Sequence, residues 1–294
     1  MTFEFEWTPP AAASGNISFF VAANAANNNA NADSGDRVYT ARATLTPGAA
    51  PPAGPRPSIS AGGVVNGGSF QPGFAQNTWV TIRGTNLAAN TRTWGGNDFV
   101  GNRLPTALDG TAVNINGKPA YVYFISPTQL NVLSPVDTAT GNVAVEVVRD
   151  GVRSDAFTAI KSAFSPAFFI FNNDRYIAAT HANGSFLGPT SLFAGLTTPA
   201  KPGETIVLYG TGFGPTNPDF TDGQIIPAPG VLRNTPTVRF GSLTAEVLFA
   251  GQTATGLYQL NIKVPDNAPD GDAAVVLTVG GANSPAGAFI TVQK

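Results

Sequence analysis

The chain offers few residues that could do acid–base or nucleophilic chemistry. His181 is its single histidine, and the chain has no cysteine. A serine hydrolase would need a serine nucleophile beside this histidine, and the chain has no Gly-x-Ser-x-Gly motif. One imidazole also falls short of the ligand sets that are typical of zinc sites. We therefore interpret His181 as a polar residue of a hairpin and predict that the protein is not an enzyme.

The glycine-rich stretch Gly210-Thr-Gly-Phe-Gly214 is superficially similar to a dinucleotide-binding motif. That chemistry requires a helix that begins directly after the glycines, because the helix N-terminus holds the pyrophosphate. Pro215, Pro218 and Gly223 are incompatible with such a helix. The stretch is therefore interpreted as a turn between strands.

Aspartate-rich loops are the remaining candidates for a metal site, and calcium is the metal they would suit. Calcium takes about six to eight oxygen ligands, which loops rich in Asp and Asn can supply. The candidate clusters are Asp33 and Asp36 beside the loop 27–31, Asp219 with Asp222, and Asp266 with Asp270 and Asp272. None matches an EF-hand, and Asp, Asn and Gly are common in turns that bind no metal. We predict no cofactor and keep calcium as the alternative.

Trp94 is the best candidate for a ligand contact. It lies in a long loop, residues 88–103, and is followed by Gly95 and Gly96. An exposed tryptophan can stack on a sugar or anchor a partner protein. The alternative is that Trp94 folds back over its own domain as a lid.

Other large aromatic residues are assigned to the protein core. Trp79 lies in a strand with period-two alternation, which favours burial. Phe164, Phe168 and Phe171 are also predicted to be buried, where they would cover the junction between two repeats.

The elements that must position these residues occur twice. The stretch Gly256-Leu-Tyr-Gln-Leu-Asn-Ile-Lys-Val-Pro265 repeats the pattern of Ser126-Pro-Thr-Gln-Leu-Asn-Val-Leu-Ser-Pro135. Apolar and polar side chains alternate in the later copy, which predicts a half-buried β-strand. Proline closes each copy, as expected where a strand stops donating to its neighbour.

Each copy contains a Gln-x-Asn pair on its polar side. The pairs are Gln129 with Asn131 and Gln259 with Asn261. We expect these amides to cap loop backbone groups, since buried backbone groups need partners. A role in ligand binding is the alternative.

Further segments recur in the same order, so the chain is predicted to hold two related β domains in series. Gly84-Thr-Asn-Leu87 corresponds to Gly210-Thr-Gly-Phe213, and residues 113–124 correspond to 238–249. The predicted organisation is a partial β segment at 1–48, a proline-rich linker at 49–58, and immunoglobulin-like repeats at 59–162 and 163–294, the second with an extra N-terminal hairpin. In 1–48 the expected strands are an alternating run with Phe3, Phe5 and Trp7, a run at 17–22 and a run at 37–45.

Composition limits the classes of function. The chain has 294 residues, of which 12% are charged, and its net charge is -2, so it has no basic surface for nucleic acid. No apolar run approaches the roughly 18–20 residues needed to cross a bilayer, so no membrane insertion is expected. The low charge and the lack of cysteine suit an extracellular or cell-surface bacterial protein. Since no signal peptide is recognisable, we expect the chain to be a fragment of a longer polypeptide.

Motifs spread over residues 59–294 together resemble a known family. They include Ala61-Gly-Gly-Val-Val-Asn66, Ser69-Phe-Gln-Pro-Gly73, Leu104-Pro-Thr-Ala-Leu108 and Tyr209-Gly-Thr-Gly-Phe-Gly-Pro215. In this order they resemble the functionally uncharacterised Solibacter-type C-terminal domain family of secreted bacterial proteins. The Gly-Thr-Asn-Leu and Val-x-Phe-Gly elements resemble IPT/TIG modules. This resemblance implies an all-β fold of two tandem immunoglobulin-like β-sandwiches, and it supplies no catalytic residues.

The first residues resemble a different family. Trp7-Thr-Pro-Pro10, Gly15-Asn-Ile-Ser-Phe-Phe-Val-Ala22 and Gly35-Asp-Arg-Val-Tyr39 resemble the C-terminal part of a reeler-like domain. The resemblance implies that the earlier strands of such a domain are missing and that residues 1–48 have unpaired strand edges.

These observations lead to two functional hypotheses. The first is a structural or adhesive module of a bacterial surface, whose partners are copies of itself or other surface proteins, and which in a sharper form builds a filament by strand addition. The second is an accessory carbohydrate-binding module on a secreted enzyme, which would contact polysaccharide through Trp94. A carboxylate enzyme built from Asp219 and Asp222 is the least favoured reading, since nothing in the sequence brings the two together.

Overall fold

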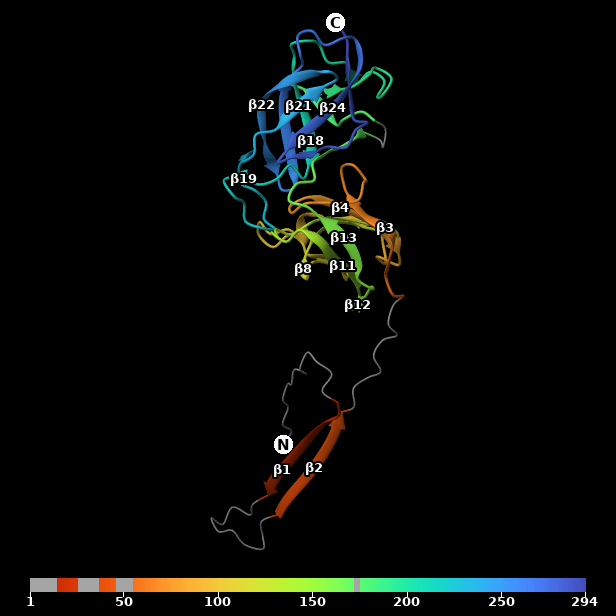
Figure 1. Cartoon of the computed structure of the whole chain (residues 1–294). Helices are drawn as coiled ribbons and strands as arrows, with labels where there is room; N and C mark the ends of the chain where they lie inside the picture. The colour runs from red at the N-terminus through yellow and green to blue at the C-terminus, as the bar shows by residue number, and fades with distance from the viewer. Residues whose placement is uncertain (1–14, 26–36, 46–54, 172–174) are drawn as a thin grey trace. The chain divides into compact units, whose positions relative to one another are not determined.

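The computed structural model describes residues 15–25, 37–45, 55–171 and 175–294. Internal contacts divide the chain into two units, Met1–Ala53 and Gly54–Lys294, and this boundary falls inside the predicted linker. Regular structure in the described ranges is β-strand apart from short 3-10 turns, which confirms the predicted all-β class (Figure 1). No helix in these ranges is long and apolar enough to cross a membrane.

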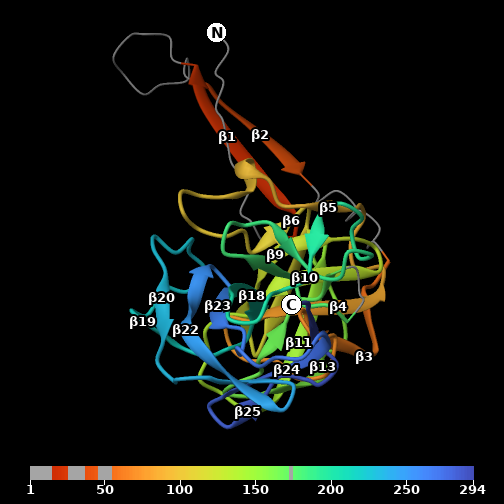
Figure 2. The ribbon, with the colours of Figure 1, turned by 90° about the horizontal axis from the view of Figure 1, so that it is seen from above.

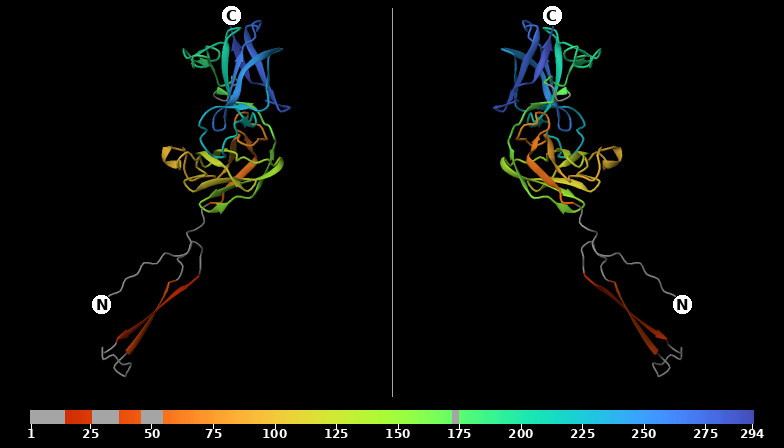
Figure 3. Two further views of the ribbon diagram at one scale, coloured as in Figure 1. Left: turned by 90° about the vertical axis from the view of Figure 1, so that its left-hand side faces the viewer. Right: turned by 90° about the vertical axis from the view of Figure 1, so that its right-hand side faces the viewer.

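The first unit contains a two-stranded antiparallel ribbon (Figure 3). Strands β1 (Ile17–Ala25) and β2 (Arg37–Leu45) pair along their whole length, with Ile17 opposite Leu45. Both were predicted from the sequence. The third predicted strand, with Phe3, Phe5 and Trp7, lies outside the described residues, as do the calcium candidates Asp33 and Asp36. The reeler-like resemblance stays a prediction.

Repeat 1 of the second unit is a sandwich of two sheets. The first sheet has the order β3-β4-β10-β9-β5, with β3 (Ser58–Asn66), β4 (Trp79–Thr85), β5 (Arg92–Thr93), β9 (Tyr121–Ile125) and β10 (Gln129–Leu133). The second has the order β12-β11-β7-β6, and β13 pairs with β11 and β8 with β7. Its strands are β6 (Ala107–Leu108), β7 (Thr111–Ile115), β8 (Lys118–Pro119), β11 (Gly141–Arg149), β12 (Val152–Arg153) and β13 (Phe157–Lys161).

The core of repeat 1 lies between these sheets. Successive strand residues point to opposite faces, so Val80 and Ile82 of β4 share one buried cluster with Val113 and Ile115 of β7. Leu130 of β10 belongs to the same cluster and is fully buried. Each such side chain stabilises the fold by about 1.5–3 kcal/mol relative to exposure.

Repeat 2 is built on the same plan but forms a single thirteen-stranded sheet. Its main strands are β18 (Thr205–Thr211), β21 (Thr237–Phe240), β22 (Leu243–Ala254), β23 (Leu257–Lys263), β24 (Gly271–Val279) and β26 (Phe289–Val292). Shorter strands are β14 (Ala167–Phe168), β15 (Ala179–His181), β16 (Phe186–Leu187), β17 (Thr197–Thr198), β19 (Thr216–Asn217), β20 (Gly230–Leu232) and β25 (Ala282–Asn283).

The length of β22 explains this difference between the repeats. Residues 243–245 of β22 pair with β21, and residues 246–254 pair with β23, so one strand belongs to both layers (Figure 2). The corresponding path in repeat 1 is interrupted at Ala120, between β8 and β9. Repeat 1 therefore has two separate sheets around its core.

The prediction that Phe164, Phe168 and Phe171 are buried at the junction of the two repeats is wrong in part. Phe168 is buried in the core of repeat 2 beside Phe213, as predicted. Phe164 is only partly buried against that core, and Phe171 packs on two phenylalanines of repeat 2, Phe186 and Phe193. Successive residues of an extended segment point in opposite directions, so Phe169, and not Phe168, is directed toward repeat 1.

Hydrogen bonds join the two repeats at several places. Asn66 Nδ2 donates to the carbonyl oxygen of Ser165 at 2.9 Å, and Asn77 Nδ2 donates to Gln252 Oε1 at 3.0 Å. At another point the backbone N–H of Leu104 donates to the carbonyl oxygen of Gly223 at 2.9 Å. The repeats are therefore docked within one unit.

Lys161 ends β13 and is buried in repeat 1, with 2% of its surface exposed. Its Nζ donates to the carbonyl oxygen of Asp137 and, at 2.8 Å, to that of Ala139. These carbonyls belong to the connection between β10 and β11. Burial lowers the pKa of the Lys161 ammonium, and the two carbonyls satisfy it where water cannot.

Candidate ligand-binding cleft

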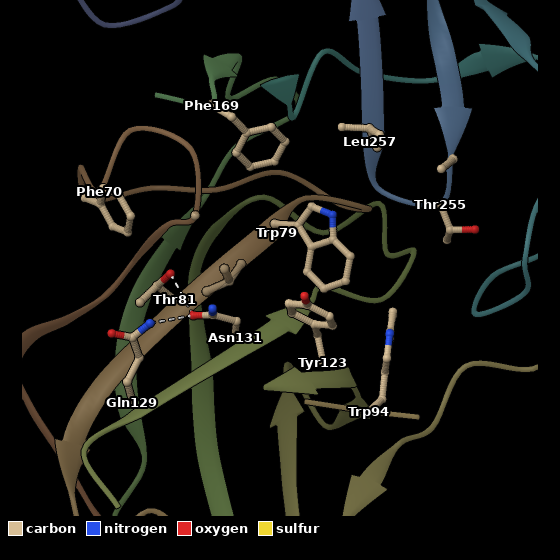
Figure 4. A pocket seen from close by; sticks show the side chains of 13 residues that line it. Phe70, Trp79, Thr81, Trp94, Tyr123, Gln129, Asn131, Phe169, Thr255 and Leu257 are labelled. Carbon is tan, nitrogen blue, oxygen red and sulfur yellow. Dashed lines mark hydrogen bonds between the residues drawn. The ribbon is translucent and has the colours of Figure 1, made fainter. Parts of the chain in front are cut away.

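A cleft of about 420 Å³ lies on the outer face of the first sheet of repeat 1, where repeat 2 meets it (Figure 4). Strands β4, β9 and β10 supply its floor, because residues that alternate with the buried core residues point outward there. The lining residues are Gly67, Phe70, Trp79, Val80, Thr81, Trp94, Tyr123, Gln129 and Asn131 from repeat 1, and Phe169, Ala254, Thr255 and Leu257 from repeat 2.

Three aromatic side chains form a connected cluster in this cleft. The ring centroids of Trp79 and Tyr123 are 5.5 Å apart, those of Trp94 and Tyr123 are 4.9 Å apart, and those of the two tryptophans are 5.9 Å apart. All three contacts are edge-to-face, an arrangement that aromatic rings favour. Phe70 and Phe169 line the other side of the cleft (Figure 4).

The prediction that Trp79 belongs to the core is wrong. Its neighbours Val80 and Ile82 are fully buried, and Trp79 alternates with Val80 onto the outer face, where it is partly buried and lines the cleft. Trp94 is likewise partly buried, packs against the edge of the core cluster and lines the same cleft. The two roles considered for Trp94 are thus geometrically compatible, and its contact with a ligand stays a prediction.

A salt-bridge network orders the loop that carries Trp94. The backbone N–H of Trp94 donates to the carbonyl oxygen of Tyr123 at 2.8 Å. Two residues earlier, Arg92 donates from Nη1 and Nη2 to the Asp98 carboxylate at 2.7 and 3.0 Å. Its Nε and Nη2 also donate to the Asp109 carboxylate, both at 2.7 Å. One guanidinium therefore ties Asp98 within the loop to Asp109 in the turn between β6 and β7.

The same bonds set the charge state of the network. The Arg92 guanidinium, with help from Asn90, holds the pKa of Asp109 well below its usual range. Arg92 and the backbone N–H of Gly95 also lower the pKa of Asp98. Both carboxylates are therefore ionised wherever aspartate is normally ionised. The sequence analysis missed this network, because a loop sequence does not show which carboxylates its arginine will reach.

A set of polar side chains lies beside the aromatic cluster. Thr81 Oγ1 donates to Asn131 Oδ1 at 3.1 Å, and Gln129 Nε2 donates to the same oxygen at 3.0 Å (Figure 4). The expectation that these amides cap loop backbone groups is therefore wrong for Gln129 and Asn131. Both bonds use Asn131 Oδ1, so the Asn131 amide N–H groups and Gln129 Oε1 are not bonded to another described side chain.

None of the described side chains that line the cleft carries a formal charge at neutral pH. The lining thus combines stacking surface with amide and hydroxyl groups. Such a site can bind an uncharged ligand that has both an apolar face and hydroxyl groups. The described lining contains no Asp, Glu, His, Lys or Arg.

His181 lies elsewhere, at the end of β15. As the sequence analysis predicted, it lies in a tight hairpin to β16. The backbone N–H of His181 donates to the Ser185 carbonyl oxygen at 2.9 Å, and the Gly184 N–H donates to the His181 carbonyl oxygen at 2.9 Å. Its ring bonds the Glu204 carboxylate through Nδ1 at 2.5 Å, and Nε2 lies 2.9 Å from Thr198 Oγ1. The imidazole therefore links β15 to its neighbouring segments.

The remaining calcium candidates are held by other partners. Asp219 bonds the Arg233 guanidinium, whereas Asp222 lines a different pocket. Asp266 pairs with Lys263, Asp270 accepts from the backbone N–H of Lys294, and Asp272 pairs with Arg175. Within the described ranges no three His, Asp or Glu side chains gather in one place.

The glycine-rich stretch at 210–214 is a strand end followed by a turn, as predicted. Gly212 and Gly214 have positive φ values of 74° and 107°, and the chain continues into strand β19, not into a helix. Gly210 and Thr211 still belong to β18.

Comparison with protein families gives one match within the second unit. Residues 68–165 match the model of the IPT/TIG domain. This finding agrees with the resemblance of the Gly-Thr-Asn-Leu elements, and the resemblance to the Solibacter-type family stays a prediction. No curated protein matches the chain by sequence.

The solved structures that match the chain are distant. A Bacteroides ovatus mixed-linkage glucan utilisation locus protein, SGBP-B, solved with a mixed-linkage heptasaccharide, is 10% identical with a TM-score of 0.33, over 96% of this chain and 54% of that one. The SGBP-B of a Bacteroides uniformis xyloglucan utilisation locus is 12% identical with a TM-score of 0.25, over 80% and 50%. The extracellular region of plexin A4 is 14% identical with a TM-score of 0.27, over 81% and 18%. The chain thus spans about half or less of each, and the likeness concerns β architecture, not ligand or activity.

Proposed function

We propose that the chain is a non-catalytic binding module of a secreted or surface-exposed bacterial protein, and that its cleft binds a neutral polysaccharide. The observation that carries this proposal is the joint lining of Trp79, Trp94 and Tyr123 beside Gln129 and Asn131, with no charged side chain among the described lining residues. The module would hold a larger protein on its substrate or its surface.

The chemistry of pyranose sugars matches this lining. One face of a pyranose ring presents C–H groups that stack on an indole or phenol ring, with aromatic contacts contributing about 0.5–1.5 kcal/mol each beyond area burial. The sugar hydroxyl groups would accept from the Asn131 amide and donate to Gln129 Oε1. Because the described lining bears no charge, binding should depend little on salt, and a polyuronate should gain nothing from its carboxylates.

The test measures binding of the full chain to soluble neutral polysaccharides, namely mixed-linkage β-glucan, xyloglucan and galactomannan, with polygalacturonate as the charged comparison. Trp79→Ala and Trp94→Ala should each weaken binding by about tenfold or more, since each removes a stacking surface. Phe186→Ala is the matched control, because Phe186 is 45% exposed but does not line the cleft. The proposal would be contradicted if the wild-type chain bound none of the neutral polymers, or if both tryptophan variants bound them as tightly as the wild type.

The β1–β2 ribbon favours a second candidate, a structural or adhesive role through strand addition. Within the described residues these two strands pair only with each other, and Phe20 and Val38 are 74% and 69% exposed. An exposed strand edge can pair with another chain. Light scattering of residues 1–294 beside 55–294 tests this candidate: assemblies formed by the longer chain alone support it, and two monomers contradict it.

A further inference from the structure

We infer that Thr211 of repeat 2 is a positioning residue for Trp79 of repeat 1, so that the binding cleft is complete only when the two repeats are docked. The inference rests on the proposed function, because Trp79 is taken as a stacking surface for the sugar. It goes beyond the proposed function because Thr211 does not line the cleft and lies in repeat 2.

Thr211 connects the two repeats through one hydroxyl group. It ends β18, and none of its surface is exposed. Its Oγ1 accepts a hydrogen bond from the backbone N–H of Trp79 at 3.1 Å and donates to the carbonyl oxygen of Gly256 at 3.0 Å. A single buried hydroxyl thus ties the start of β4 to the turn between β22 and β23.

The Gly256 turn also contacts the indole directly. Gly256 has a φ of +73°, and a Cβ placed there would lie 2.8 Å from Trp79 Nε1 and 2.4 Å from Leu133 Cδ1. The backbone of repeat 2 therefore lies against the indole ring of Trp79 with no space for a side chain between them. Thr211 fixes the distance of this turn from the tryptophan.

Repeat 1 also holds the backbone of Trp79. The backbone N–H of Gly67 donates to the Trp79 carbonyl oxygen at 2.7 Å. The Trp79 N–H donates to Thr211 Oγ1. The N–H and the carbonyl of Trp79, which point to the same side of an extended strand, are therefore bonded to different repeats, one across the junction and one within repeat 1. Thr78, which precedes Trp79, bonds Ser134 of repeat 1, so loss of the cross-junction bond frees the Trp79 N–H alone. The indole can then leave the edge-to-face position against Trp94 and Tyr123.

The test compares Thr211→Val, which keeps the shape but removes the hydroxyl, with Thr211→Ser, which keeps the hydroxyl. Thr197→Val is the matched control, because Thr197 is a buried threonine of repeat 2 whose Oγ1 also bonds backbone carbonyls, of Pro189 and Phe193, away from the cleft. All are made in the full chain and measured below their unfolding temperatures. Affinity for mixed-linkage β-glucan should fall about five- to tenfold in Thr211→Val, be restored in Thr211→Ser and be unchanged in Thr197→Val.

A second readout does not depend on any ligand. Two tryptophans 5.9 Å apart should give an exciton-coupled circular dichroism signal, which Trp94→Phe identifies by removing it. Thr211→Val should reduce this signal, and Thr211→Ser and Thr197→Val should preserve it. A Thr211→Val chain that keeps the full signal overturns the inference, whatever the ligand result. A reduced signal in a chain whose wild type binds no neutral polysaccharide supports the positioning role and rejects the proposed function instead.

Discussion

In repeat 1 Gln129 donates to Asn131 at 3.0 Å, and in repeat 2 Gln259 donates to Asn261 at 2.8 Å, on the equivalent central strand. The strand paired with each differs in composition. Asn131 lies opposite Thr81, which donates to it, whereas Asn261 lies opposite Val207, which has no polar group. The shared amide pair is therefore a property of the repeat, and its use in a cleft depends on the neighbouring strands.

The aromatic cluster separates the repeats further. Trp79 starts β4, but Thr205 starts the corresponding β18. Tyr123 on β9 corresponds to Leu248 on β22, which is 51% exposed. Repeat 2 thus keeps the scaffold without the stacking surface, and it contributes to the cleft through its turn and through Phe169 instead. The two repeats therefore share a strand plan, while the aromatic and amide lining of the cleft comes mostly from repeat 1.

Core truncation at equivalent positions should have the largest effect. Leu130 and Leu260 are both fully buried in central strands. Leu130→Ala and Leu260→Ala should each lower the free energy of unfolding by about 2–5 kcal/mol. Urea unfolding followed by tryptophan fluorescence, in a Trp7→Phe background, reports on repeat 1. If the repeats unfold together, Leu260→Ala shifts this transition as well, and an unmoved transition would show that the repeats unfold separately.

Weakening the loop network should have an intermediate effect that is confined to repeat 1. Asp109→Asn removes a carboxylate that Arg92 bonds, so glucan affinity should fall about three- to tenfold while stability changes by less than about 1 kcal/mol. Asp155→Asn is the control, since the Arg56–Asp155 pair is exposed and does not line the cleft. An affinity equal to that of the wild type would mean that the loop is ordered without this network.

The same network predicts the acid limit of binding. The folded-state pKa values of Asp98 and Asp109 lie below their unfolded values, so their stabilisation is fully present above about pH 4. It is lost as the pH falls from there toward the folded-state values. Glucan affinity should be constant from about pH 5 to 8 and decrease below about pH 4, with far-ultraviolet circular dichroism showing whether the sandwiches are still folded. A midpoint near pH 6 would point to another group.

Amide substitution should have the smallest effect and should distinguish the two copies most directly. Gln129→Met retains side-chain length but removes the amide, and glucan affinity should fall about fivefold, as for one lost hydrogen bond. Gln259→Met makes the same change in repeat 2, outside the lining, and should leave affinity unchanged. Equal losses in the two variants would place the ligand on repeat 2 as well.

Alternation and duplication in the sequence were sufficient to predict the all-β class and most of the main strands, because a period of two is the direct consequence of strand geometry. The same alternation places Trp79 with Thr81 and Arg83 on the polar face of β4, opposite the buried Val80 and Ile82. The prediction that Trp79 is in the core followed its apolar character instead of this pattern, and so it was wrong.

The candidate site was predictable in part. Gly95 and Gly96 beside Trp94 indicated an exposed loop, and the structure brings that loop to the sheet. The residues that share the cleft with Trp94 were not predictable, because its partner Tyr123 lies on β9 and Phe169, on the other side of the cleft, comes from repeat 2. Contacts between residues so far apart depend on how the repeats dock, and no local pattern records that.

The buried Lys161 ammonium has a consequence for chemical labelling. An amine-acylating reagent reaches Lys118, whose side chain is 51% exposed, but it cannot reach a nitrogen that is enclosed and bonded to two carbonyls. Acylation of Lys161 therefore requires β13 to separate from the connection between β10 and β11. The rate of Lys161 acylation, measured by peptide mass spectrometry, would therefore report the rate at which repeat 1 opens. This measurement works in a mixture of proteins, where spectroscopy cannot follow one protein.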